Sequence, residues 1–185
     1  ANILLKCPPK DANAKLAMAF GRASVEYVKV QAPIIAGVHG TEHDRIAWQG
    51  FLATETDPDI SGGLHTGLAR MGVEESRAWF LSTLLQSKLL ASELWIDRAV
   101  YMLDTWVVPT LVKMLEREDA AYTVSPDDSP KVIRVKDLAA WAVLTILKPP
   151  TDNPDRRVPQ PVAKRSYTPE EMNQVRAIAK AAEAK

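Results

Sequence analysis

The chain has 185 residues, of which 46% are hydrophobic and 25% are charged, a composition suited to one ordinary globular domain with extensions. Its 23 basic and 23 acidic residues cancel, so net charge alone does not indicate a nucleic-acid-binding protein. The single cysteine, Cys7, excludes an internal disulfide and favours a reducing compartment.

The longest apolar run, residues 138–147, is too short for a membrane span, which needs about 20 residues, and the apolar run at residues 3–5 is too short for a signal peptide. We therefore expect no membrane contact. The expected location is the cytoplasm, or a particle assembled there.

The N-terminal third is predicted to form a short arm and two helices. Residues 1–10 end in a proline pair and predict an N-terminal arm. Apolar spacing predicts a helix over residues 12–31 that ends at Pro33, and Thr41 with Asp44 predicts the capped start of a second helix reaching Leu52. Residues 56–63, which include Gly62-Gly63, predict a loop.

The middle of the chain is predicted to supply the core. Residues 73–119 show apolar residues at helical spacing and no glycine; we divide this pattern near Ala91, with Ser92 as a cap and Pro109 as a kink. Residues 122–124 and 132–135 flank a proline-rich turn and predict one small β-hairpin. Residues 137–147 are nearly all apolar and predict a buried helix.

The C-terminal part is predicted to be a linker followed by a docking helix. Residues 148–167 include five prolines, and residues 148–185 carry 8 basic and 5 acidic residues, against 15 and 18 in residues 1–147. This charge difference would let the tail of one copy lie on the body of another. Thr168, Pro169 and Glu171 predict a capped helix start, but the apolar face at Met172, Val175 and Ile178 is too thin to stabilise an isolated helix, so we expect a partner surface to hold it.

These elements predict an all-α fold. The expected architecture is an irregular helical bundle of five or six helices with one small β-hairpin and extended N- and C-terminal arms. The predicted divisions are an N-terminal arm (1–10), a helical core domain (11–147), a proline-rich basic linker (148–167) and a C-terminal docking helix (168–185).

One segment, residues 39–44, is rich in potential metal ligands, with His39, His43 and Asp44 close in sequence. The pair His43-Asp44, followed by Asp104, resembles the metal-dependent HD phosphohydrolases. That family has an earlier histidine in another helix, and no histidine precedes His39. The resemblance implies a metal-dependent phosphohydrolase as a third functional hypothesis; the residues themselves predict no catalytic, cofactor or metal site.

Acidic and aromatic residues in the long apolar pattern are interpreted as surface and interface positions. Glu93, Asp97 and Asp104 have spacings that place them on one helix face, which we interpret as solvated or interfacial; no Glu is followed by His three residues later, so a di-iron site is not predicted. Trp95 and Trp106, eleven residues apart, are predicted to share a helix face and to anchor a protein partner.

The preferred functional hypothesis is a non-enzymatic structural or assembly subunit of a multi-copy complex, such as a virus or phage particle, whose arms bind neighbouring subunits. Met172, Val175, Ile178, Trp95 and Trp106 are the predicted partner-binding residues, and no cofactor is expected. The alternative is a small helical subunit of a ribonucleoprotein complex. Its nucleic-acid-binding residues would be Arg156, Arg157, Lys164 and Arg165, which lie in the extended basic segment.

Overall fold

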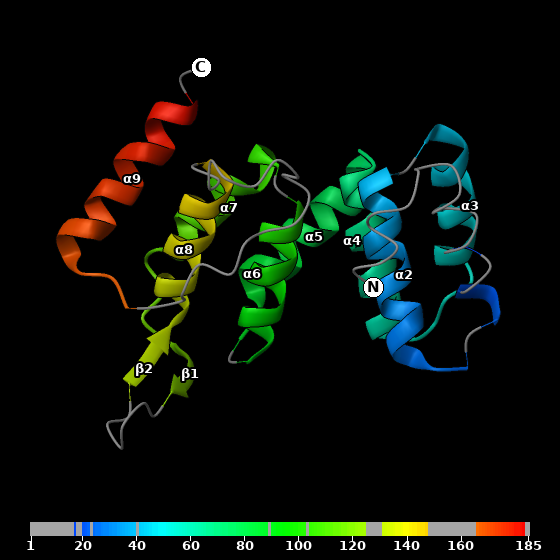
Figure 1. The fold of residues 1–185 in the computed structure, drawn as a ribbon, viewed down its shortest axis with the longest axis horizontal. Helices are drawn as coiled ribbons and strands as arrows, with labels where there is room; N and C mark the ends of the chain where they lie inside the picture. Colours follow the sequence, from blue (N-terminus) through cyan, green and yellow to red (C-terminus); the bar gives the residue numbers. More distant parts are fainter. Residues whose placement is uncertain are drawn as a thin grey trace. The chain divides into compact units, whose positions relative to one another are not determined.

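The structure, a computed structural model, describes residues 17, 20–22, 24–39, 41–88, 90–102, 104–124, 131–147 and 166–183. The predicted N-terminal arm and residues 148–165 of the predicted linker lie outside this part of the chain. The described residues are mostly helical with one two-stranded antiparallel sheet, which confirms the all-α fold class (Figure 1). The chain divides into two compact units, Ala1–Phe80 and Leu81–Lys185, each described by itself below.

The described elements are short. In chain order they are α2 (Glu26–His39), α3 (Glu42–Leu52), α4 (Pro58–Arg70), α5 (Glu74–Gln86), α6 (Leu90–Met102), the 3-10 turn η2 (Thr105–Val107), α7 (Val108–Met114), β1 (Ala120–Val124), β2 (Lys131–Arg134), α8 (Val135–Leu147) and α9 (Pro169–Glu183).

Close packing of α2 against α4 forms the centre of the first unit. A Cβ atom added at Gly67 would lie 2.1 Å from the carbonyl oxygen of Pro33, and one at Gly63 would lie 2.4 Å from that of Val30. Only glycine leaves room for backbone approach of this kind. The glycines of α4 therefore determine how closely the two helices pack.

This packing corrects two predictions from the sequence. Pro33 lies inside α2 instead of ending a helix, because residues 32–37 are buried and the contact with α4 compensates for the amide hydrogen that proline lacks. Residues 58–63 belong to α4 and not to a loop: Asp57 caps the helix, Pro58 occupies its first turn, and Gly62 and Gly63 are buried within it.

Helix α3 begins as the sequence predicts. The Asp44 carboxylate accepts a hydrogen bond from the Thr41 amide at 2.9 Å, and the Thr41 hydroxyl accepts one from the Asp44 amide at 3.3 Å. This is a complete capping box. The helix then buries Trp48, whose ring meets those of Phe20 and Phe51 at centroid distances of 5.4 and 5.5 Å.

Helix α8 is the core of the second unit. Ten of its residues are buried, and α6, α7 and α9 pack against it. The predicted hairpin is confirmed, with Tyr122 opposite Ile133, although the second strand ends one residue earlier than predicted because Val135 begins α8. Residues 125–130, the predicted turn, lie outside the described residues.

The long apolar pattern divides more often than predicted. Helix α5 ends at Gln86 and α6 begins at Leu90, so Ser92 lies inside α6 and is buried, and it is not a cap. Helix α6 ends at Met102, and Pro109 lies in the first turn of α7, where its missing amide hydrogen costs no helical hydrogen bond. The predicted kinked helix is therefore two helices joined by η2.

Candidate docking site of the C-terminal helix

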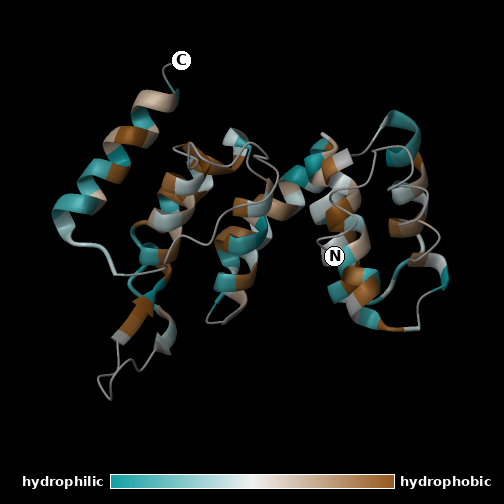
Figure 2. Ribbon diagram, in the orientation of Figure 1, coloured by the Kyte–Doolittle hydropathy of each residue, from teal (hydrophilic) through white to brown (hydrophobic). Residues whose placement is uncertain are grey.

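Helix α9 lies on a surface of its own unit that we call the α9 seat. The α9 seat consists of Val108 and Pro109 of α7, Glu116 just after α7, and Asp137 and Leu147 of α8. In Figure 2, α9 carries alternating hydrophilic and hydrophobic bands, as expected for a helix with one buried face.

The start of α9 is fixed locally by the predicted capping box. The Thr168 amide donates to Glu171 Oε2 at 2.8 Å, and the Glu171 amide donates to Thr168 Oγ1 at 3.2 Å. Pro169 is the first residue of the helix, as the sequence predicts. The helix therefore begins at a defined residue before it meets the α9 seat.

The apolar stripe of α9 is buried within the second unit. Met172, Val175 and Ala179 are 4%, 1% and 2% exposed, whereas Ile178 is half-buried. Burying a Met or Val side chain contributes about 1.5–3 kcal/mol relative to leaving it exposed. Two of the three predicted partner-binding residues of this helix thus already have a surface, which the sequence alone did not reveal.

Asp137 is the polar anchor of the α9 seat. Its side chain is 3% exposed, and its two oxygens accept hydrogen bonds from the Arg134 amide and the Tyr167 amide, both at 3.0 Å. One carboxylate therefore stabilises the start of α8 and fixes the residue that leads into α9. Sequence reasoning did not select Asp137 as a site residue, although a lone acid in an otherwise apolar helix was the available signal.

The far end of α9 borders a cavity. Ala179, Ala182 and Glu183 line a cavity of about 280 Å³ together with the seat residues Val108, Pro109 and Leu147, and with Thr105 and Trp106 of η2. Because Tyr167 lies at the start of α8 and Ala182 lies near its end, α8 and α9 run in the same direction, as Figure 1 also shows.

Ion pairs involve the segment that connects α7 to β1. Arg176 of α9 contacts Glu116 at 2.8 Å, and Lys136 of α8 contacts Glu118 at 2.5 Å. The hydrogen bond from Lys136 lowers the pKa of Glu118 below its usual value. The contact of Arg176 with Glu116 joins a basic residue of the tail to an acidic residue of the body, in line with the charge difference in the sequence.

The two tryptophans predicted as interface anchors do not share a helix. Trp95 lies in α6 and is half-buried, with the guanidinium carbon of Arg98 4.5 Å from its ring centroid. Trp106 lies in η2 and borders the cavity at the end of α9. Asp104 lies after the end of α6, in extended backbone just before η2. The predicted common helix face of Glu93, Asp97 and Asp104 is therefore not formed.

Other predicted site residues fall in different places. Arg156, Arg157, Lys164 and Arg165, the predicted nucleic-acid-binding residues, lie outside the described residues, as does the side chain of His39. His43 is exposed at the start of α3, and the Asp44 carboxylate belongs to the capping box. His43 and Asp104, which contribute to the resemblance to the HD phosphohydrolases, belong to different units.

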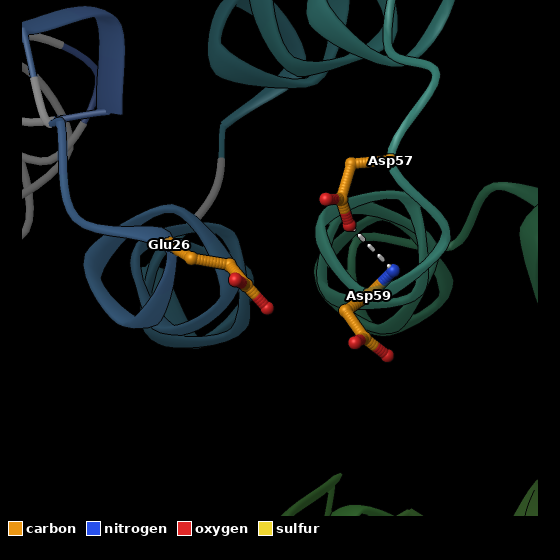
Figure 3. Close-up of side chains that lie close together, drawn as sticks. All are labelled: Glu26, Asp57 and Asp59. Atoms are coloured by element: carbon orange, nitrogen blue, oxygen red, sulfur yellow. Dashed lines mark hydrogen bonds between the residues drawn. The ribbon is translucent and has the colours of Figure 1, made fainter.

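Among the described side chains, one acidic group has the spacing of metal ligands. Carboxylate oxygens of Glu26, Asp57 and Asp59 lie within 4.8 Å of one another where α2 and α4 begin (Figure 3). Asp57 Oδ1 already accepts the amides of Asp59 and Ile60 at 2.9 and 3.1 Å as the cap of α4. Capping therefore accounts for the position of Asp57.

A second polar group joins α4 to α5 in the first unit. His65 Nδ1 lies 3.2 Å from the Ser76 hydroxyl oxygen, and its ring stacks on Trp79 at a centroid distance of 4.2 Å. Burial lowers the pKa of His65 below its usual value of 6.5. The arrangement favours a neutral imidazole that packs between two helices.

No family model, curated protein or solved structure matches this chain. None of the described helices is both long enough and apolar enough to cross a membrane.

Proposed function

We propose that this chain is a non-enzymatic structural or assembly subunit of a larger multi-copy complex, such as a virus or phage particle, and that α9 is the element that binds neighbouring subunits. The observation that carries the proposal is the docking of α9: a capped amphipathic helix, at the end of a long proline-rich segment, buries a narrow apolar stripe on a matching surface. Helix-in-groove docking of this kind is a common mode of recognition between protein chains.

The physical reason is the contrast between α9 and the rest of the second unit. Helix α8 is buried along most of its length, whereas α9 contributes three buried residues and leaves its other faces exposed. A helix of this length with so narrow a stripe is marginal in water and depends on its docking surface for stability. Such a helix suits a contact that forms and is broken as subunits assemble.

The test compares two full-length variants that place the same charge on different faces of α9. Val175→Asp puts a carboxylate in the buried stripe, whereas the matched control Ala177→Asp puts one on the exposed face. Light scattering over a concentration series should show assembly of the wild type and the control, with assembly of Val175→Asp weakened by at least about a hundredfold.

Two outcomes would count against this proposal. A wild-type chain that stays monomeric up to about 1 mM would leave no assembly to explain. Co-purification of nucleic acid, measured by absorbance at 260 and 280 nm, and its loss when Arg156, Arg157, Lys164 and Arg165 are all changed to Ser, would support the ribonucleoprotein alternative instead.

A further inference from the structure

The parallel course of α8 and α9 requires the chain to return before it docks. Asp137, near the start of α8, holds Tyr167 just before α9, while Leu147, the last residue of α8, borders the same cavity as Ala182 near the end of α9. At about 1.5 Å per residue, the return from Leu147 to the level of Asp137 covers about 15 Å.

The sequence between the two helices is longer than this return requires. Residues 148–165 can span up to about 60 Å at full extension. The length of this segment therefore permits α9 to reach the α9 seat of its own chain and that of a neighbouring copy.

The contacts that hold α9 would be the same in either case. The Tyr167 amide would meet Asp137, Arg176 would meet Glu116, and the stripe would lie on α7 and α8, whichever copy supplied the helix. What differs is concentration, because a tethered helix meets its own seat at an effective concentration in the millimolar range. Docking on a neighbouring copy competes with docking in the same chain once copies are held together at a comparable local concentration, as they are in an assembly.

We propose that α9 is exchanged between copies, so that α9 of one chain docks on the α9 seat of a second copy of this chain. Asp137 is then the polar anchor and the contact of Glu116 with Arg176 is the charge contact across the interface. The inference rests on the proposed function and adds the identity of the neighbour and its binding site. Mutual exchange closes a dimer, whereas exchange in one direction continues from copy to copy and builds a larger array.

The exposed pair Glu116 and Arg176 allows a test that leaves the buried core unchanged. Glu116→Arg and Arg176→Glu each place like charges together when α9 docks in its own chain. In an exchanged heterodimer of the two variants, both contacts unite opposite charges. The double variant Glu116→Arg/Arg176→Glu restores the pair within one chain and is the matched control.

The two single variants, one of them labelled with ¹⁵N, are unfolded, mixed and refolded together at about 1 mM in low salt, and their dimers are counted by native mass spectrometry. We expect the ratio of heterodimer to homodimers to exceed its statistical value by about fivefold, with the excess lost in high salt and lost when Val175→Asp is added to both variants. The double variant alone should dimerise like the wild type.

The opposing outcomes separate this inference from the proposed function. If the wild type assembles but the mixture gives a statistical ratio of dimers, or only monomers, α9 is not exchanged and the subunits use another surface. In that case the inference is overturned together with the role of α9 in binding neighbouring subunits, and the assembly function stands without it. If the wild type itself stays monomeric at about 1 mM, both fail.

Discussion

At the scale of single residues, Gly67 has the most demanding environment in the first unit. An added Cβ would lie 2.1 Å from the Pro33 carbonyl oxygen, which is backbone and can move only with the helix. We expect Gly67→Ala to lower the free energy of unfolding by about 3 kcal/mol, measured by urea unfolding, because α2 and α4 must separate.

Gly50 provides the control, since it lies inside α3 and nothing lies within 4 Å of an added Cβ. There the ordinary helix preference of alanine applies, and Gly50→Ala should stabilise the protein by about 0.5–1 kcal/mol. Equal effects of the two changes would mean that close approach of α2 and α4 is not what makes Gly67 necessary.

His65 gives the first unit a pH-dependent contribution to stability. Burial lowers its pKa in the folded state, so below about pH 6.5 the unfolded state binds a proton that the folded state does not. The contribution of His65 to the free energy of unfolding is therefore complete above about pH 6.5. It is lost as the pH falls toward the lowered pKa that His65 has in the folded state. We expect His65→Phe, which keeps a ring against Trp79, to lose less stability than the wild type between pH 8 and pH 5 in urea unfolding.

The other titrating groups supply the comparison for this prediction. Asp119 and Glu118 also lose favourable interactions on acidification, because hydrogen bonds from Arg117 and Lys136 lower their pKa values, but both groups are present in the wild type and in His65→Phe and therefore affect the two pH profiles alike. A wild type and a His65→Phe variant with parallel pH profiles from 8 to 5 would show that His65 is not the group responsible.

At the scale of elements, the sequence predicts the features that depend on nearby residues. The capping boxes at Thr41 and Thr168 form as expected because they depend on residues three apart in the chain. The hairpin of β1 and β2 was also predictable, since its turn residues lie between two short runs of β-branched residues. Local chemistry is sufficient in each of these cases.

The errors occur where packing with a distant segment overrides local preference. Pro33 and Gly63 act as helix breakers in isolation, yet each lies in a helix because α2 and α4 pack there at close range. The α9 seat was not predictable for the same reason, as Asp137 and Tyr167 are thirty positions apart. The apolar stripe of α9 indicated that a surface was needed, but spacing alone does not tell which surface.

At the scale of the whole molecule, each compact unit has its own buried core. Leu64 and Leu68 of α4 are fully buried in the first unit, as are Leu111 of α7 and Leu138 of α8 in the second. Chains built from two such units commonly depart from a single cooperative transition. Changes that weaken one core should therefore leave the other largely intact.

We expect Gly67→Ala to increase amide hydrogen exchange in α2 and α4 while α8 keeps its protection. We expect Val175→Asp to increase exchange in α8, which packs against α9, while α2 and α4 keep their protection. The effects of Gly67→Ala and Val175→Asp on the free energy of unfolding should add within about 0.5 kcal/mol when one chain carries both changes. Loss of protection in both units from either change would show that the chain unfolds as one cooperative body. Undocking α9 from its seat would then also disturb the first unit, and the exchange of α9 would require the whole subunit to open.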